Sequence, residues 1–161
     1  MIPEIDRDYL RSVLNYDPIT GEFRWKAKTN GRVRVGMIAG KSAREKKHIQ
    51  IRVRGRMYLA HRLAWLYCHG VWPHGQLDHI NCDRFDNRIA NLRIATHAQN
   101  CANRHALTGL KGASRATNGK WQARISINGV QHYLGLFDTA EEANSAYRAK
   151  ATEAFGEFAR W

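Results

Sequence analysis

The stretch LDHINCDRFDNRIANLRIA, residues 77–95, decides the fold of the middle of the chain. Residues 76–80 and 92–95 each predict a short strand, and the polar residues 81–87 between them predict a loop. Thr96 can cap a helix directly after the second strand. The region therefore predicts a strand, a loop, a second strand and a helix in succession.

Four polar side chains on these elements have the chemistry of a hydrolytic site. Asn91 follows His79 by twelve positions, and Asn100 follows Asn91 by nine. Phosphodiester hydrolysis needs a base that activates water, a cation beside the leaving oxygen, and groups that hold both. His79 can take a proton near neutral pH, and Asn91 can hold its ring in one tautomer. Asp78 and Asn100 offer oxygen atoms, which favour Mg²⁺ or Mn²⁺ over zinc.

The residues before this region predict two helices and a strand. Asp6 can cap a helix that runs to about Tyr16, and residues 23–25 predict a short strand. Residues 60–69 have apolar side chains at helical spacing. We expect His61, at the start of that helix, to be a structural hydrogen-bonding group outside the catalytic set.

Positive charge is concentrated in one segment of the chain. Lys and Arg number 26 against 14 Asp and Glu, a net charge of +12, and residues 24–62 contain thirteen of the basic residues but only one acidic residue, Glu45. Such an excess favours a polyanionic partner, although a solvated basic surface is the simpler alternative. Residues 48–59 alternate charged and strand-forming residues, which predicts a hairpin with one basic face and DNA contacts. The contacting residues would be Arg52, Arg54 and Arg56.

From about residue 108 the pattern changes to a small antiparallel sheet followed by one helix. Turn residues at 117–119 and 128–129 separate three strand-like runs. Thr139 and Glu142 form a capping box at the start of the helix, and Gly156 suits its end. The boundary between the two parts is expected at residues 103–110.

Cysteine content and hydropathy indicate an intracellular protein. The three cysteines, at positions 68, 82 and 101, form no CxxC pair, so we interpret them as reduced thiols. A mixed metal site of Cys82, Cys101 and a histidine is the alternative. No apolar run of about 18 residues and no signal-peptide pattern is present, which predicts no membrane association. The expected location is the cytoplasm of a bacterial or phage-infected host.

Several spaced blocks resemble the HNH endonucleases of phages and mobile introns. They are Tyr16-Asp17-Pro18-Ile19-Thr20-Gly21, His61-Arg62-Leu63-Ala64-Trp65, Leu77-Asp78-His79-Ile80-Asn81, Asp86-Asn87-Arg88, Asn91-Leu92-Arg93 and Ala98-Gln99-Asn100. The resemblance implies a ββα-metal fold with His79 as general base, Asp78 and Asn100 as metal ligands, and Asn91 as the residue that orients the histidine. We further expect Arg88 and Arg93 to steady the phosphate. Cys82 stands where many members have glycine, so a positive φ there would strain the loop.

Residues 111–158 resemble the APETALA/ethylene-response DNA-binding domain. The blocks that match are Gly119-Lys120-Trp121-Gln122-Ala123-Arg124-Ile125, Tyr133-Leu134-Gly135-Leu136-Phe137 and Asp138-Thr139-Ala140-Glu141-Glu142-Ala143. That family packs a helix on a three-stranded sheet whose exposed face reads the major groove of DNA. The resemblance implies DNA contacts from Arg115, Trp121, Arg124, Ser126 and Tyr133, although core packing is the alternative role of the two aromatic residues.

These observations predict an α+β protein of two modules. Residues 1–104 would form an HNH nuclease with a basic hairpin region, and residues 108–161 an ethylene-response-factor-like DNA-binding domain. The predicted function is a metal-dependent endonuclease that cuts double-stranded DNA in a homing or mobile-element role. The alternatives are a transcriptional regulator with a non-catalytic HNH scaffold and a zinc-stabilised structural protein. The sequence does not distinguish a monomer from a dimer.

Overall fold

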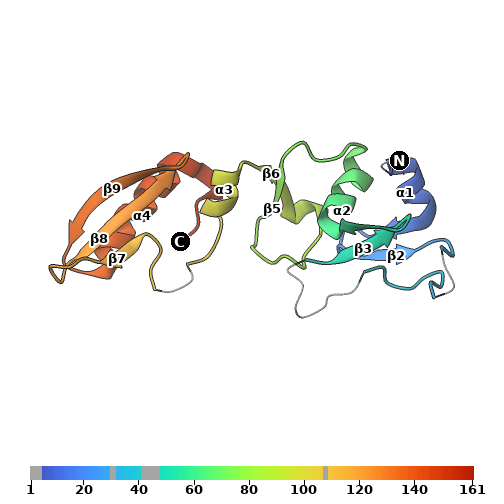
Figure 1. Cartoon of the computed structure of the whole chain (residues 1–161), viewed down its shortest axis with the longest axis horizontal. Coiled ribbons are helices and arrows are strands. Elements are labelled where there is room, and N and C mark those ends of the chain that lie inside the picture. The colour runs from blue at the N-terminus through green and yellow to red at the C-terminus, as the bar shows by residue number, and fades with distance from the viewer. Residues whose placement is uncertain (1–4, 30–31, 41–47, 107–108) are drawn as a thin grey trace. The chain divides into compact units, whose positions relative to one another are not determined.

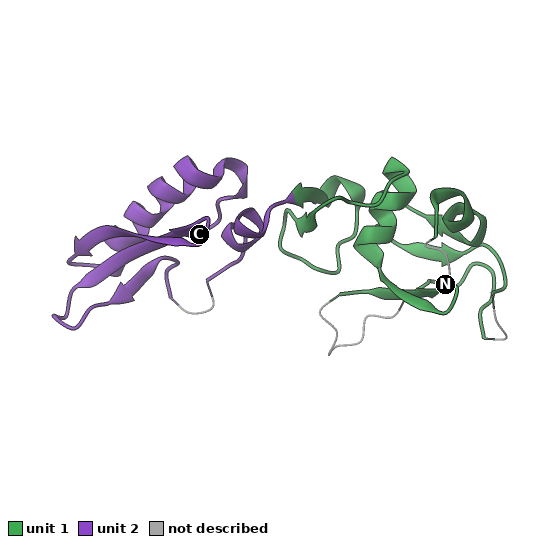
Figure 2. Ribbon diagram, turned by 45° about the horizontal axis from the view of Figure 1, so that its top comes forward, with its two compact units in different colours: residues 1–94 green, residues 95–161 purple. Residues whose placement is uncertain are grey.

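The computed structural model describes residues 5–29, 32–40, 48–106 and 109–161. The chain divides into two compact units, residues 1–94 and 95–161, and contains both helices and small antiparallel sheets (Figures 1 and 2). This boundary precedes the predicted linker at residues 103–110, of which 107 and 108 lie outside the described residues. Within the described ranges, no helix is long and apolar enough to span a membrane.

The first unit opens with a helix that is shorter than predicted. Helix α1 (Arg7–Val13) begins at Asp6, whose Oδ1 accepts a hydrogen bond from the Tyr9 amide at 2.7 Å. The prediction that this helix reaches Tyr16 is wrong, because Leu14–Tyr16 forms strand β1 and pairs with β2 (Phe23–Trp25). The extended backbone buries Leu14 and Tyr16 on one face, in the hydrophobic core, and leaves the residue between them exposed.

A hairpin and a helix complete the core of this unit. Strands β3 (Gln50–Val53) and β4 (Arg56–Leu59) are joined by a turn whose residues, Arg54 and Gly55, have φ values of 48° and 77°. Helix α2 (Ala60–His69) follows directly and ends at Gly70 in the left-handed conformation. One hydrophobic core joins these elements to α1, β1 and β2; its fully buried members include Leu10, Leu14, Phe23, Ile51 and Leu63.

Residues 77–95, the stretch that begins the sequence analysis, fold into most of a two-stranded ribbon. Strands β5 (Gln76–His79) and β6 (Leu92–Ala95) pair with each other, and the short 3-10 helix η1 (Ile89–Asn91) leads into β6. The amide of Ile80 donates to the Asn91 carbonyl at 2.9 Å and so extends the contact between the two strands. This ribbon brings Asp78 and His79 close to residues of the loop and of β6.

The second unit contains a helix, a sheet and a longer helix. Helix α3 (His97–Ala102) has a capping box between Thr96 and Gln99. The strands β7 (Ala113–Arg115), β8 (Trp121–Ile127) and β9 (Val130–Phe137) form an antiparallel sheet in that order. Helix α4 (Ala140–Phe155) contacts all three strands and is followed by the 3-10 helix η2 (Gly156–Phe158).

Two residues after the linker hold this unit together. Gly112 has a φ of 79°, and a Cβ at this position would overlap the ring of Tyr147, so only glycine allows the close approach of the chain to α4. The ammonium group of Lys111 donates to the carbonyls of Ala102, Arg104 and Arg160. Since Ala102 is the last residue of α3, Lys111 ties this helix to the C-terminal end of the chain.

Candidate active site

Asp78 and His79 are both almost fully buried on strand β5. Their exposed fractions are 4% and 5%. Consecutive side chains of a strand point to opposite faces of the sheet. Asp78 and His79 follow this rule, because they contact different residues. Asp78 contacts Arg93 of β6, whereas the ring of His79 lies against Asn87 of the loop and His61 of α2. The two groups therefore occupy adjacent but different environments.

Asp78 forms a buried ion pair with Arg93. Arg93 Nε donates to Asp78 Oδ2 at 3.0 Å, and only 5% of the Asp78 side chain and 13% of the Arg93 side chain are exposed. A buried carboxylate is tolerated when a partner compensates its charge. We predicted that the guanidinium group of Arg93 steadies a phosphate. In the structure it forms an ion pair with Asp78, the proposed metal ligand.

The amide oxygen of Asn87 contacts the imidazole of His79. His79 Nε2 lies 3.3 Å from Asn87 Oδ1, and Asn87 is only 1% exposed. The sequence prediction gave this orienting role to Asn91 and missed Asn87. The motif Asp86-Asn87-Arg88 was visible in the sequence, but nothing in it showed that its asparagine turns inward.

Asn91 holds the loop instead of the imidazole. Its Oδ1 accepts from the Asn81 amide at 3.0 Å, and its Nδ2 donates to Asn81 Oδ1 and to the Asp86 carbonyl, both at 2.9 Å. The side-chain hydrogen-bonding groups of Asn91 are thus used within the loop, and the prediction that it contacts His79 is wrong. Its effect on His79 is indirect, because it fixes the loop that bears Asn87.

The rings of three histidines, His48, His61 and His79, pack against one another. The His61 and His79 centroids are 5.1 Å apart at near-perpendicular planes, and the centroid of His48 lies 5.0 Å from that of His61. Burial, and after it the nearby His79 and His48, lower the pKa of His61 to about 3. Burial also lowers the pKa of His79, which the hydrogen bond with Asn87 partly opposes. His79 is therefore neutral at pH 7 and able to accept a proton.

His61, which we expected to lie outside the catalytic set, packs directly against the candidate base. It is 5% exposed and packs against His79 edge-on, so it belongs to the surroundings of the site. Among the described residues, no group of three or more His, Cys, Asp or Glu side chains could hold a metal ion, and this includes the three histidines. The structure therefore gives no support to a closed zinc site in the described residues.

The loop between the strands is fixed by its own side chains. Arg88 donates to both oxygens of Asp86, at 2.8 and 2.6 Å, and these bonds lower the pKa of Asp86 to about 2. Asn81 Nδ2 donates to Asp86 Oδ2 at 2.7 Å. Arg88, another predicted phosphate contact, is half exposed and is paired with this carboxylate.

Cys82 adopts the strained backbone conformation that the sequence suggested. Its φ is 63°, and its amide donates to the His79 carbonyl at 2.8 Å. A non-glycine residue in this conformation costs about 1 kcal/mol. We therefore expect Cys82→Gly to raise the free energy of unfolding by about 1 kcal/mol, measured by urea titration. Cys82→Ser keeps the strain and is the matched control; an equal gain in both variants would contradict the explanation.

Asn100, the second predicted metal ligand, is a half-buried residue of α3. This helix contacts α4 and η2 and belongs to the second compact unit. Its amide donates to the Thr96 carbonyl at 3.0 Å, as expected within the first turn of a capped helix. The pairing of Asn100 with Asp78 at one cation stays a prediction.

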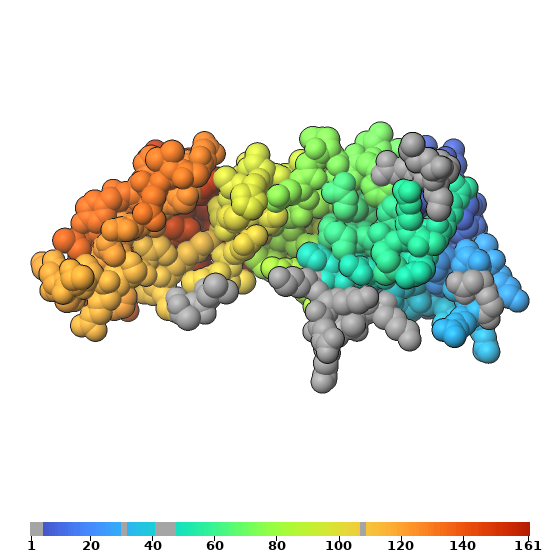
Figure 3. Space-filling view, in the orientation of Figure 1, coloured from blue at the N-terminus to red at the C-terminus, as the bar shows by residue number. Residues whose placement is uncertain are grey.

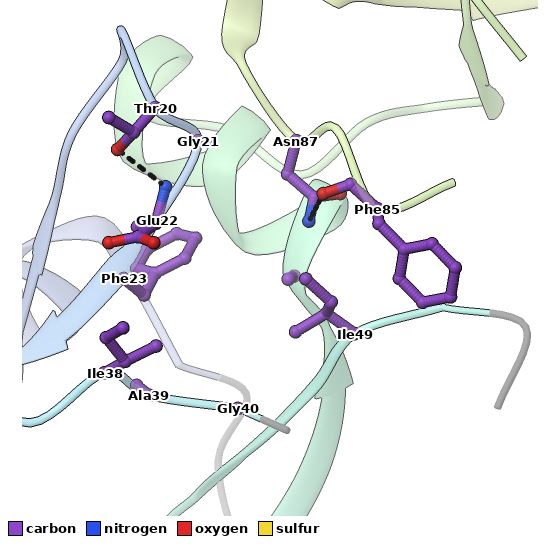
Figure 4. A pocket seen from close by; sticks show the side chains of 11 residues that line it. Thr20, Gly21, Glu22, Phe23, Ile38, Ala39, Gly40, Ile49, Phe85 and Asn87 are labelled. Carbon is purple, nitrogen blue, oxygen red and sulfur yellow. Dashed lines mark hydrogen bonds between the residues drawn. The ribbon is translucent and has the colours of Figure 1, made fainter. Parts of the chain in front are cut away.

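A pocket of about 260 Å³ lies beside Asn87 in the first unit. It is lined by the turn at residues 20–23, by residues 38–40, and by Ile49, Phe85 and Asn87 (Figure 4). Most of its wall is apolar, and Asn87 is the lining residue that also contacts His79. Asn87 therefore borders both this pocket and the candidate base.

Comparison with known proteins gives the family of the chain. Residues 58–102 match the family model described as HNH endonuclease. Over 107 residues the chain is 30% identical to Protein 3.8 of Escherichia phage T7, covering 63% of this chain and 88% of that protein. The chain belongs to the HNH endonuclease family. This confirms the predicted enzyme family.

A second relative is longer than the region it shares with the chain. Over 106 residues the chain is 33% identical to an uncharacterized HNH endonuclease of Acanthamoeba polyphaga mimivirus. The aligned region covers 65% of this chain and 57% of the relative. No solved structure matches the chain. The HNH match extends from β4 to the end of α3, so the likeness of residues 111–158 to a plant-type DNA-binding domain stays a prediction.

The hairpin formed by β3 and β4 does not have a single basic face. Arg52 pairs with Met57 on the exposed side, whereas Arg56 pairs with Val53, whose side chain is buried. The guanidinium of Arg54 lies 3.6 Å above the ring of Tyr9. The prediction of one face is wrong because directly paired residues share a side of a ribbon. All three arginines are exposed, and the hairpin lies at the surface of its unit (Figure 3).

The remaining basic residues of this region are only partly described. Within the basic segment 24–62, residues 30–31 and 41–47 lie outside the described residues. Arg24 pairs with Glu22 at 2.9 Å, and Arg62 donates to two backbone carbonyls at 3.4 Å. At least some of the charge of this segment is therefore used within the fold.

The C-terminal sheet separates the predicted DNA-contacting residues into two groups. Arg124 pairs with Tyr133, and both are exposed on the face opposite to α4, as is Ser126. Arg115 pairs with Trp121, which the alternation of β8 places on the same side as the buried Ala123. Trp121 is half-buried, which favours a packing role, whereas Tyr133 is 57% exposed and available to a partner.

Proposed function

We propose that the chain is a metal-dependent endonuclease that hydrolyses phosphodiester bonds in double-stranded DNA. The observation that supports this best is the buried imidazole of His79 next to the buried carboxylate of Asp78, inside the residues that match the HNH family. A homing or mobile-element role is consistent with relatives from two viruses. An intracellular location remains a prediction.

His79 supplies the base in this proposal. Its neutral ring takes a proton from water, and the resulting hydroxide attacks the phosphorus. Asn87 holds the ring through Nε2, and Asn91 holds the loop that positions Asn87. Asn87 and Asn91 together keep the ring in one orientation while it accepts the proton.

The donor atoms fit a hard divalent cation. Asp78 would hold the cation through a carboxylate oxygen and Asn100 through an amide oxygen, and water or phosphate oxygens would complete the shell, as is usual for Mg²⁺. The cation would supply charge stabilisation for the departing oxygen. Arg93, which already pairs with Asp78, compensates the charge of this buried carboxylate.

A plasmid cleavage assay tests the proposed chemistry. We expect supercoiled DNA to be cut in Mg²⁺ or Mn²⁺ and left intact when EDTA removes the cation. Activity that survives EDTA, or that requires stoichiometric zinc in the purified protein, would show that the proposed ligand set is wrong.

The alternative is a DNA-binding regulator that uses the HNH domain only as a scaffold. The charge of +12 supports DNA binding in either case. The enzyme is favoured because binding alone does not need a carboxylate beside a phosphate, where it would repel the backbone. Tight DNA binding without cleavage in any divalent cation would favour the regulator.

Two sets of substitutions should separate affinity from sequence choice. Replacing Arg52, Arg54 and Arg56 with alanine should weaken binding to all DNA sequences and lower the slope of log affinity against log salt by about one per lost phosphate contact. Arg124→Ala, on the open face of the C-terminal sheet, should instead reduce the preference for a chosen site over random DNA. Filter binding at several salt concentrations measures both; an unchanged preference in Arg124→Ala would exclude this residue from base recognition.

A further inference from the structure

We propose that the turn formed by residues 34–37 enters a groove of duplex DNA, with Val35 against the wall of the groove and Arg34 at a phosphate. This inference deepens the proposed function and rests on it for the choice of DNA as the partner. The turn belongs to the first unit and lies between β2 and β3 in the chain.

The turn is anchored to strand β2. The Met37 amide donates to the Arg34 carbonyl at 3.2 Å, and Gly36 has a φ of 84°, as the third residue of a type II turn requires. The buried Trp25 holds both sides of the turn. Its carbonyl accepts from the Gly36 amide at 2.7 Å, and its amide donates to the Met37 carbonyl at 2.8 Å. The core of the unit therefore sets the position of the turn.

Three large apolar side chains are exposed in this turn and directly after it. Val35 is 67% exposed, Met37 47% and Ile38 51%. Single apolar residues at a surface are ordinary, whereas several that adjoin one another indicate an interaction surface. The turn thus presents apolar side chains that the fold itself does not bury.

The charge around these side chains is complementary to DNA. Residues 24–38 contain five basic residues and no acidic one. All five are exposed: Arg24, Lys26, Lys28, Arg32 and Arg34. A duplex presents phosphates on both sides of grooves that are lined by sugars and base edges, and apolar side chains can contact these groove walls. Cations around an apolar tip therefore fit a groove better than an apolar protein surface, which offers no charge to meet them.

One pocket connects the turn to the candidate active site. Ile38, the residue after the turn, lines the pocket that Asn87 also borders, as Figure 4 shows. Asn87 in turn contacts the ring of His79, the candidate base. Because a duplex is wider than this pocket, DNA held at His79 can reach the turn at the same time.

Salt-dependent binding separates the apolar contact from the charged one. In EDTA, which prevents cleavage, Val35→Ser should weaken binding to a mixed-sequence duplex about tenfold, because about two methyl groups lose their contact. The slope of log affinity against log salt should stay the same, since valine displaces no counterions. Arg34→Ala should instead lower that slope by about one. Fluorescence anisotropy of a labelled duplex measures affinity and slope.

Val71→Ser is the matched control for the apolar substitution. Val71 is 64% exposed and follows α2 in the same unit, so it resembles Val35 in residue type and exposure. This variant should bind DNA as the unmodified chain does. Both serine variants should unfold at the urea concentration of the unmodified chain, because both side chains are exposed.

Several results would overturn the proposal. One is an affinity of Val35→Ser within about twofold of the unmodified chain, or an equal loss in Val71→Ser. A lower urea midpoint in Val35→Ser would show that the chain itself covers this side chain. Sedimentation that finds a dimer only with Val35 present would assign the turn to a second copy.

The binding measurements and the cleavage assay have separate meanings. The expected affinities and slopes in a protein that does not cut DNA would contradict the endonuclease while leaving the role of the turn intact. Normal cleavage with unchanged affinity in Val35→Ser would contradict the role of the turn alone. A chain that does not bind duplex DNA would overturn both.

Discussion

His79→Ala is expected to lower the rate of DNA cleavage by about a hundredfold or more, because it removes the general base. Affinity for DNA should change little, since the neutral ring is buried and contributes no charge to the phosphates. Single-turnover cleavage and equilibrium binding on the same duplex measure the two effects. His74→Ala, an exposed histidine of the same unit, is the matched control and should cleave normally.

The pH profile gives a second test of His79. Since burial lowers the pKa of this ring, the neutral base persists on acidification, and cleavage should decline only below the ordinary histidine value of about 6.5. Unchanged cleavage in His79→Ala would show that another group takes the proton.

Replacing Asp78 with leucine should abolish metal-dependent cleavage and also destabilise the fold. The change removes a proposed metal ligand and leaves the largely buried Arg93 without its carboxylate. Breaking a buried ion pair from one side typically costs about 3–5 kcal/mol of unfolding free energy. Urea unfolding followed by fluorescence of the tryptophans measures the loss.

A double replacement separates the two effects of Asp78→Leu. In Asp78→Leu/Arg93→Leu neither charge remains buried, so most of the lost stability should return. Cleavage should stay absent, because the proposed metal ligand is still missing. Recovered cleavage in the stable double variant would show that Asp78 acts only through the fold.

Local patterns in the sequence were enough to place most elements. The caps at Asp6, Thr96 and Thr139 and the turn at Arg54-Gly55 each satisfy backbone groups within a few residues, so they can be predicted from nearby sequence alone. Strand β1 could not be predicted in this way. Its burial depends on pairing with β2, which follows it only after an intervening turn.

The site was predictable in its chemistry and less so in its contacts. The adjacent Asp78 and His79 were visible as a pair, but Asn87 and Asn91 are both asparagines of the segment between β5 and β6. Spacing cannot distinguish them, because the choice depends on which amide the folded loop turns toward the ring. The opposite sides of Arg52 and Arg56 likewise follow from strand register, which the sequence pattern did not reveal.

The way in which Lys111 ties down α3 bears on how modules of this kind can be exchanged between proteins. Lys111 binds the carbonyl of Ala102 at the end of the helix that bears Asn100, and this helix packs within the second unit. A chimera joined between residues 104 and 108 would remove Lys111 and α4 from the helix that they support. A joint at residues 94 and 95 would transfer the helix together with its own packing, so the last asparagine of the HNH motif is best inherited with the C-terminal module.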